Sequence, residues 1–385
     1  MPFLPFYIAR HKHLRIIIIG GGYAGIAGLV TILRHMPGAS ITLVDPGSHH
    51  LKITHLHETF RYPLEDFLIP FSVLENRFGC RHVRAKLTLD EHTLRQWQNN
   101  KFLIANNEIL EFDYLLITSG TPAGWIKKSE TVFDLQDFIT AAGTHLLDSR
   151  ITPGDSRKQS ISVVGGGATG IQFLFEIAYF LKRRRVDNKL RLIHGGDRVL
   201  TQFHRSLSSY TEARMADLEI ELYPHTRFLE HQGDHLLIRE CETGRDFDLP
   251  SSTTFLFLGK KAEVVFSANA FGQVIIEGKP LQNVFTAGDC SVYDSIGSNA
   301  MTAQSAVRKG MVAGRNILRH SSVVKLLEPY LHRDLGYVIS LGPTDAVGWL
   351  ASERNMMSGM PALAIKELVE AQYDLLLTGI DSYIV

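Results

Sequence analysis

Cysteine is scarce in this chain, and the few cysteines that occur are widely spaced. Three of the 385 residues are cysteine: Cys80, Cys241 and Cys290. They are too far apart in sequence to form a CxxC or CxxxxC pair, so neither short dithiol motif is present. So few cysteines indicate a reducing compartment. We expect Cys290 to be a small buried residue.

Net charge and long apolar runs are also lacking. The formal net charge is +0 and the isoelectric point is about 7.3, which gives no basic field for nucleic acid. No run approaches the roughly 18 apolar residues of a membrane-spanning helix. The first residues, MPFLPFYIARHKHLR, are broken by Pro2 and Pro5, which disfavours a cleaved signal peptide and predicts an unstructured lead-in. We expect a cytoplasmic protein, and peripheral contact with the inner face of a membrane stays open.

Histidine is locally abundant, but no ligand set accompanies it. His49, His50, His55 and His57 lie within a few residues of one another. A metal site would normally add cysteines or a clear set of carboxylates at ligand spacing, and neither is visible. We therefore favour structural roles for these histidines and predict no metal.

The most informative feature present is a duplicated glycine-rich motif. IIIIGGGYAG spans residues 16–25 and ISVVGGGATG spans residues 161–170. Each follows an apolar β-branched run and opens a helix-like run, which is the context that a dinucleotide-binding GxGxxG motif requires. A lone motif of this kind is weak evidence, whereas two in this context predict two dinucleotide sites.

The glycines of each motif have separate expected tasks. The first lets the chain turn tightly, the second leaves room for a pyrophosphate, and the third allows the helix to pack close to the strand. The pyrophosphate is expected on the unpaired N–H groups at the positive end of the helix. These glycines are Gly20, Gly22 and Gly25 in the first motif and Gly165, Gly167 and Gly170 in the second.

The two motifs differ at the residue expected beside the adenosine ribose. Asp45 ends the strand after the first motif, where a carboxylate accepts hydrogen bonds from an unphosphorylated ribose. His194 stands at the corresponding place after the second motif, with Asp197 close behind. A histidine cannot bind two ribose hydroxyls as a carboxylate does, and it tolerates a 2′-phosphate. We therefore expect weak discrimination between NADH and NADPH at the second site.

The order of these motifs resembles that of the flavoproteins with two dinucleotide-binding domains, in the pyridine nucleotide-disulfide oxidoreductase superfamily. Three further stretches carry the resemblance: FDYLLITSG at 112–120, NVFTAGDC at 283–290 and MTAQSAVRKG at 301–310. The resemblance implies FAD on the first motif and NADH or NADPH, as substrate, on the second. It implies further cofactor contacts from Gly120, Gly259, Gly288, Asp289, Thr302 and Ala303.

The implied fold class is α/β, with two Rossmann-like dinucleotide-binding domains and a small C-terminal cap. The chain would start the FAD domain at residues 13–125, insert the NAD(P)H domain at 156–250, and return to the FAD domain at 251–320. Polar, proline-containing stretches at 148–159 and 250–254 are the expected linkers. The cap would comprise residues 321–385, with two strands within 330–350.

Within the superfamily, the chain looks most like the type II NADH:quinone oxidoreductases and the ferroptosis-suppressor, apoptosis-inducing-factor-like flavoproteins. The segment ITHLHE at 53–58 resembles a stretch beside the flavin, which makes Thr54 and His55 candidate contacts. Because no dithiol motif is present, electrons are expected to pass directly to a quinone or another small acceptor. The alternatives are a reductase of a soluble acceptor and a slow NAD(P)H-sensing flavoprotein.

Three residues are the candidates for catalysis. Quinone reductases of this type usually carry glutamate where this chain has Gln172, and an amide cannot relay a proton. Glu176 lies one helical turn further on the same face and could substitute if it reaches the ring. Gln304 is expected in the acceptor pocket at the start of the flavin-facing helix.

The C-terminal segment 362–377 has apolar residues at helical spacing. One interpretation is a face for the bilayer or for a second subunit in a homodimer. The other is a helix that packs on the protein's own core. The acidic residues of the segment disfavour attraction to anionic lipid, so the sequence leaves both interpretations open.

Overall fold

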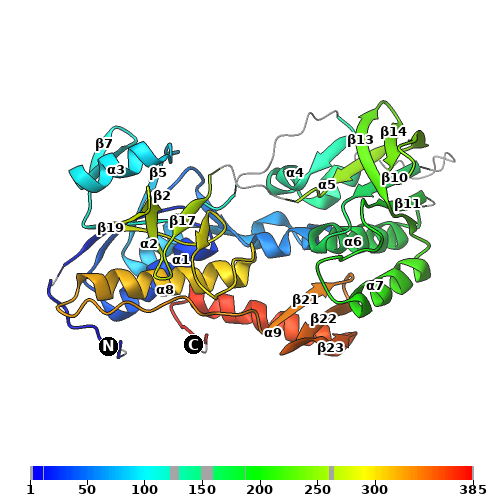
Figure 1. Cartoon of the computed structure of the whole chain (residues 1–385). Helices are drawn as coiled ribbons and strands as arrows, with labels where there is room; N and C mark the ends of the chain where they lie inside the picture. The colour runs from blue at the N-terminus through cyan, green and yellow to red at the C-terminus, as the bar shows by residue number, and fades with distance from the viewer. Residues whose placement is uncertain are drawn as a thin grey trace.

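The expected α/β fold with two Rossmann-like units is confirmed. The structure, a computed structural model, describes residues 3–11, 13–121, 130–148, 159–186, 188–259 and 264–383. Two separate sheets form two units side by side, and the C-terminal strands and helix run along both (Figure 1). The predicted domain limits at 125 and 156, and most of the linker 148–159, lie outside the described residues.

The first unit is built on an eight-stranded sheet. Its strand order is β20-β17-β18-β19-β8-β1-β2-β5. The strands are β1 (Arg15–Ile19), β2 (Ser40–Asp45), β5 (Arg81–Arg84), β8 (Tyr114–Ile117), β17 (Phe266–Ala268), β18 (Gln273–Ile276), β19 (Lys279–Thr286) and β20 (Ser291–Tyr293). From β19 to β5 all neighbours are parallel. The apolar run of β1 is buried on both faces of the sheet, which explains why it does not alternate.

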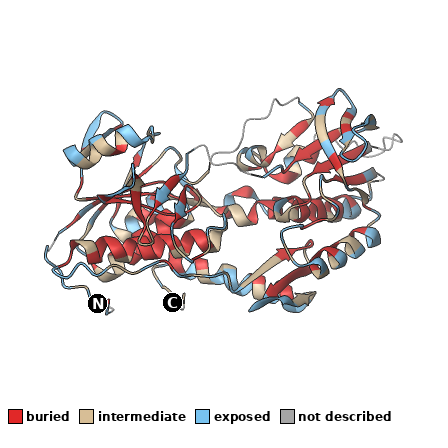
Figure 2. Ribbon diagram, viewed as in Figure 1, coloured by how far each residue is buried: buried red, intermediate tan, exposed pale blue. Residues whose placement is uncertain are grey.

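Helices cover one face of this sheet closely. These are α1 (Tyr23–His35) and α8 (Ala303–Ser321), which pack against each other and are largely buried (Figure 2). A Cβ at Gly310 would stand 2.2 Å from the Ala24 carbonyl oxygen, so glycine permits this close approach. The other elements of the unit are α2 (Phe71–Phe78), α3 (Glu91–Asn100), β6 (Phe102–Ala105) and β7 (Glu108–Glu111).

The second unit is built on a five-stranded parallel sheet of order β12-β11-β10-β16-β9. The strands are β9 (Val132–Asp134), β10 (Gln159–Val164), β11 (Asn188–Ile193), β12 (Glu221–Tyr223) and β16 (Thr253–Leu256), and the helices are α4 (Leu135–Thr140), α5 (Gly143–Asp148), α6 (Ala168–Arg184) and α7 (Arg205–Asp217). An antiparallel sheet of β13 (Thr226–Gln232), β14 (His235–Glu240) and β15 (Asp246–Pro250) lies beside it. By strand pairing, β16 and β9 belong to this unit, although the sequence placed 251–320 with the first domain.

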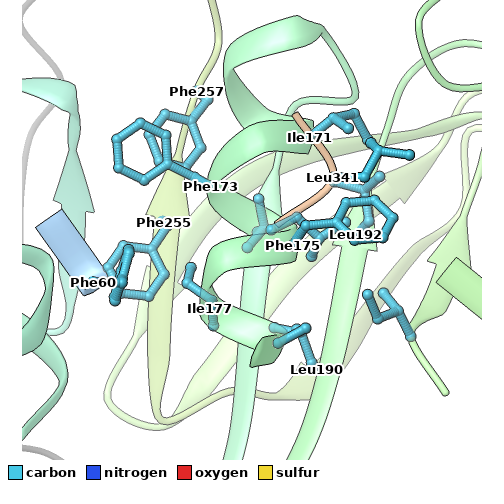
Figure 3. Close-up of a cluster of buried hydrophobic side chains, with 14 of the residues drawn as sticks. Phe60, Ile171, Phe173, Phe175, Ile177, Leu190, Leu192, Phe255, Phe257 and Leu341 are labelled. Carbon is cyan, nitrogen blue, oxygen red and sulfur yellow. The ribbon is translucent and has the colours of Figure 1, made fainter. Parts of the chain in front are cut away.

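An aromatic core fixes α6 and a neighbouring 3-10 helix. Phe173 of α6 stacks on Phe257 with ring centroids 4.5 Å apart (Figure 3). Phe60, which ends the 3-10 helix η1 (Ile53–Phe60), meets the ring edge of Phe173. η1 is preceded by β3 (His49–Leu51) and followed by η2 (Leu64–Phe67) and β4 (Leu68–Pro70). η1 thereby packs against α6, the helix that follows the second glycine motif.

The C-terminal segment connects the two units. The two strands expected within 330–350 are β21 (Gly336–Ser340) and β22 (Ala346–Leu350), and β23 (Ser352–Ser358) extends them to a sheet. α9 (Met360–Leu377) packs on α1, whereas β21 packs on α6 and β22 on α7. Buried Asp345 accepts a hydrogen bond from Arg214 of α7 at 2.8 Å, which anchors the strand connection.

The N-terminal residues pack on the first unit. The N-terminal stretch is more ordered than expected, since Leu4 is buried and Ala9 forms a β-bridge with Ser322. Apolar packing of Leu4 against the first unit explains the difference.

Among the described residues, no helix is long and apolar enough to cross a membrane.

Candidate active site

The first glycine motif forms an open cradle at the start of α1. Gly20 has φ +106°, and a Cβ there would stand 2.3 Å from the Thr118 carbonyl oxygen. By contrast, a Cβ at Gly22 would meet nothing within 4 Å. Gly22 caps α1 without a side-chain hydrogen bond, so the N–H groups of the first turn face this open space. Such a cradle fits a dinucleotide pyrophosphate.

The second motif repeats this geometry at the start of α6. Gly165 has φ +114°, and its Cβ would stand 2.2 Å from the Phe257 carbonyl oxygen. Gly167 has open space around it and caps α6 without a side-chain hydrogen bond. In both motifs the third glycine, Gly25 or Gly170, lies against the first, where a Cβ would be about 2 Å from a carbonyl oxygen. The donor chemistry of the second cradle therefore also fits a pyrophosphate.

The two expected ribose residues occupy matching places. The Gly21 N–H donates to Asp45 Oδ2 at 2.7 Å, and the Gly166 N–H donates to His194 Nδ1 at 3.2 Å. Asp45 Oδ1 also accepts from the Gly47 N–H at 2.7 Å. Burial lowers the pKa of His194, so its imidazole is neutral at pH 7. A carboxylate thus stands at one site and an uncharged ring at the other.

The loop after β19 is brought against the first motif. Gly288 has φ +82°, and its Cβ would stand 3.0 Å from the Ala24 side chain, which sets Asp289 beside α1. Buried Lys309 donates to the Ser291 carbonyl at 2.8 Å, and burial lowers the pKa of its amine to about 8. Gly120 and Gly259, the other two glycines expected at the cofactors, both have positive φ and open surroundings.

The start of α8 is defined by a side-chain cap. Thr302 Oγ1 accepts from the Ser305 N–H at 3.1 Å, and Ala303 and Gln304 form the first turn. By the resemblance, this turn would meet the flavin ring. Within the described part of the chain, no hydrogen bond is recorded for the Gln304 side chain, which leaves its amide available to a ligand.

The two candidate flavin contacts on η1 face different surroundings. Thr54 Oγ1 lies 2.9 Å from Tyr23 Oη and therefore sits beside the first motif. His55 instead lies among carboxylates, with Nδ1 3.4 Å from Glu58 and Nε2 3.7 Å from Glu370. The structure thus brings Thr54, but not the ring nitrogens of His55, to the glycine cradle.

The candidate catalytic residues on α6 have separate partners. Gln172 Nε2 donates to Ser340 Oγ at 3.2 Å, and Ser340 Oγ lies 2.9 Å from His57 Nε2. Glu176 is fully buried, and Arg61 contacts its two carboxylate oxygens at 3.0 Å each. Burial raises the pKa of Glu176 to about 7, against the opposing charge of Arg61. Glu176 is therefore held by a cation, and among the described residues no hydrogen bond joins it to Gln172.

Sequence reasoning missed the charged residues that surround Glu176. Lys366 of α9 lies 3.1 Å from Glu58 and 2.7 Å from Glu370, and all three side chains are mostly buried. His55, Glu58 and Glu370 also lie close enough together to share a metal ion. The Lys366 ammonium already meets both carboxylates there. The Lys366–Glu370 spacing could have signalled an ion pair, but a pair at i,i+4 is usual on exposed helix faces.

The three cysteines form no CxxC or CxxxxC motif, and two of them, Cys80 and Cys290, are buried and unreactive. Cys290 is fully buried, as expected, and its thiol donates to the Ala287 carbonyl at 3.4 Å. Burial, with the charge of Glu75, raises the pKa of the Cys80 thiol to about 11. Neither thiol is a ready nucleophile.

Comparisons with known proteins agree with this geometry. A model of the pyridine nucleotide-disulphide oxidoreductase family matches residues 14–310. A type II NADH:quinone oxidoreductase of Staphylococcus aureus (strain NCTC 8325 / PS 47) is 23% identical, over 93% of this chain and 94% of that protein. NDH2 from Plasmodium falciparum, solved in complex with NADH, superposes with a TM-score of 0.76 at 15% identity, over 96% of this chain and 97% of that one. A sulfide:quinone oxidoreductase from Aquifex aeolicus gives a TM-score of 0.75 at 15% identity, over 96% and 93%.

Proposed function

The chain belongs to the pyridine nucleotide-disulphide oxidoreductase family, and on that premise we propose that it is an FAD-dependent NAD(P)H:quinone oxidoreductase. The observation that carries the proposal is the pair of matching cradles at the starts of α1 and α6. The first would hold FAD, with Asp45 at its ribose. The second would hold NADH or NADPH, with His194 at its ribose. The names of the curated relatives support the quinone acceptor.

The chemistry divides between the cofactor and the chain. Bound FAD would supply two-electron chemistry between a reduced nicotinamide and an acceptor. The chain's own part is to bind, orient and provide protons. The first turn of α8, at Thr302 and Ala303, would place its positive end toward developing negative charge. Gln172 and Gln304 would orient the nicotinamide and the acceptor by their amides.

The cofactor content gives the direct test. We expect the purified protein to be yellow, with FAD bound non-covalently and released on denaturation. A steady-state screen with NADH and NADPH against short-chain quinones, ferricyanide and oxygen then identifies the acceptor class. A protein that stays colourless after refolding with FAD would overturn the assignment.

One observation favours a second candidate function. Gln172 has no acidic proton and Glu176 is held by Arg61, which fits a slow NAD(P)H-sensing flavoprotein or a reductase of a soluble acceptor. Rapid mixing separates these possibilities. An enzyme re-oxidises with its acceptor over many cycles, whereas a sensor keeps a long-lived reduced complex with the nucleotide.

The outer face of α9 bears on where the protein acts. Leu368, Val369 and Leu375 are exposed, whereas Tyr373 and Leu376 pack inward. We therefore propose that one side of α9 serves the protein's own core and the other meets a membrane surface or a second copy in a homodimer. Flotation with liposomes and measurement of the mass in solution distinguish the two partners.

A further inference from the structure

A group of buried charged side chains lies where η1, α6 and α9 meet. We call it the junction cluster: Glu58 and Arg61 from η1 and the residue after it, Glu176 from α6, and Lys366 and Glu370 from α9. The side chains retain at most 17% exposure, and that of Glu176 retains none. One network joins them, from Glu176 through Arg61, Glu58 and Lys366 to Glu370.

The charges of this cluster do not balance. Three carboxylates face two cations, so full ionisation of the carboxyls beside a neutral His55 would leave one uncompensated negative charge in a buried site. Burying such a charge costs several kcal/mol, and proteins usually avoid the cost by binding a proton. Glu370 Oε2 has no hydrogen-bond partner among the described residues and lies 3.7 Å from His55 Nε2. The geometry therefore has a place for one extra proton.

The acid–base properties of the three carboxyls agree with this count. Burial raises the pKa of Glu176 to about 7 and also raises that of Glu370, in both cases against a neighbouring cation. Glu58 differs, because a hydrogen bond from His55 and the charge of Lys366 overcome burial and hold its pKa well below the usual value. Glu58 is thus the permanent anion, and the proton belongs to Glu176 or Glu370.

Polar contacts run from the cluster toward the second glycine motif. His57 Nε2 lies 3.6 Å from Glu58 Oε1 and 2.9 Å from Ser340 Oγ. Ser340 in turn accepts from Gln172, two residues after the last glycine of the motif. Burial lowers the pKa of His57 to about 3, so its ring is neutral, and these contacts place the cluster beside the second motif.

We propose that the junction cluster stores one proton at neutral pH and that this proton is consumed when the acceptor is reduced. This inference rests on the proposed function. A hydride from NAD(P)H carries two electrons and one hydrogen, whereas reduction of a quinone to a quinol needs two electrons and two protons. One further proton must come from the protein, and the cluster holds one. Solvent replaces it past Glu370, whose side chain is 15% exposed.

Other charged and polar groups lie around the cluster. Asp374 of α9 is paired with Lys52 at 2.7 Å. Arg183 of α6 donates to the Phe60 carbonyl at 3.0 Å, and its charge also acts on Glu176. Neighbours with an exchangeable proton include His55 and His57 on η1, Tyr23 on α1 and Ser340 on β21.

Infrared difference spectroscopy of the holoprotein tests the store without turnover. At pH 7 the wild type should show one protonated carboxyl band that shifts in D₂O. Glu370→Gln and Glu176→Gln should each abolish the band, because either change balances the remaining charges. Lys366→Gln should instead double it. Asp374→Asn, which alters an exposed carboxylate on the same helix, should leave it unchanged.

Absence of the band in the wild type, or its survival in both glutamine variants, would overturn the store. Glu370→Gln tests the use of the proton, since loss of the store should slow re-oxidation by a quinone at least tenfold while reduction by NADH or NADPH is kept. An unchanged re-oxidation rate in Glu370→Gln would overturn the use of the stored proton in the reaction. If neither NADH nor NADPH reduces the protein, the proposed function fails, and the infrared result still decides whether the cluster holds a proton.

Discussion

The two glycine motifs have nearly identical backbones but different chemistry at their ribose positions. In each, the first glycine adopts a φ above +100° and lies against a carbonyl oxygen of a neighbouring strand or loop. In each, the N–H after the first glycine donates to the residue at the end of the next strand. That residue is an anion in the first unit and a neutral imidazole in the second.

The shared glycines reflect the requirements of the backbone, whereas the differing residues Asp45 and His194 reflect the expected ligands. The glycines serve the backbone in both units. On the proposed function they would also face a pyrophosphate, which FAD and the nicotinamide cofactors share. The ribose residue meets the part in which these cofactors can differ, since NADPH carries a 2′-phosphate. A carboxylate would repel that phosphate, whereas a neutral ring does not. On the proposed function, Asp45 and His194 would therefore be the residues that distinguish the cofactors.

The strongest test exchanges the first glycine of each motif for alanine. Each change forces a side chain into a left-handed conformation and against a backbone carbonyl, at a cost of about 1–3 kcal/mol from backbone strain alone. Gly20→Ala should yield a colourless protein. Gly165→Ala should keep bound FAD but no longer be reduced by NADH. Flavin absorbance and anaerobic reduction measure the two effects, and loss of FAD in both variants would break the division between the motifs.

An intermediate effect is expected from Gln172→Glu, which adds a proton donor beside the second motif. Gln172→Glu would place a carboxyl group next to Ser340, to which Gln172 Nε2 now donates at 3.2 Å. If proton delivery limits turnover, quinone reduction should rise roughly tenfold to hundredfold, the low end for general acid catalysis. Steady-state rates with a short-chain quinone measure it. An unchanged rate would mean that protons already arrive by another route or that the acceptor is not a quinone.

Gln304→Ala is the matching change on the side of the first unit. Because Gln304 lies in the first turn of α8, we expect slower re-oxidation by the acceptor and nearly unchanged reduction by NADH. Stopped-flow measurement of the two half-reactions gives their ratio. A slower reduction with normal re-oxidation would place Gln304 on the nicotinamide side instead.

The backbone of the site was predictable because its signals are local. The apolar run before Gly20, the glycine spacing and the change at His194 all lie within short stretches of sequence. The junction cluster was not predictable in this way. Glu58 and Lys366 are 308 positions apart, and their contact depends on how the C-terminal segment packs along both units. Lys366 and Glu370 by themselves have the spacing of an ordinary exposed ion pair.

Strand order was harder to predict than strand position. β9 lies only a few residues beyond the predicted end of the first part of the FAD domain, and β16 lies near the predicted return to it, yet both pair in the second sheet. A short apolar strand such as Thr253–Leu256 fits either parallel sheet equally well by composition. Its place in the second sheet is fixed by pairing with β10 and β9, which are distant in sequence.

A smaller effect is expected from placing a carboxylate at residue 194, so that the second motif has the same kind of group as the first. Native protein should use NADH and NADPH with less than about tenfold difference, which is under about 1.4 kcal/mol. His194→Glu should favour NADH, because the carboxylate binds the free ribose hydroxyls and repels a 2′-phosphate. The ratio of kcat/KM for the two nucleotides measures this. A strong native preference for NADH would mean that another residue, such as Asp197, binds the ribose.

The smallest expected effect is a pH dependence confined to the second motif. Because burial lowers the pKa of His194, its ring is neutral at pH 7 and gains a proton only as the pH falls below its depressed pKa. A bound 2′-phosphate would favour the protonated ring and raise this pKa, so NADPH should gain on NADH by a few-fold as the pH is lowered from about 7 to 5. The ratio of kcat/KM for the two nucleotides cancels effects common to both, including those of the flavin site. His194→Gln, which keeps a polar side chain but cannot titrate, should give a flat ratio across the same range. A ratio that still rises in that variant would assign the titration to the phosphate itself and leave the imidazole with a steric role only.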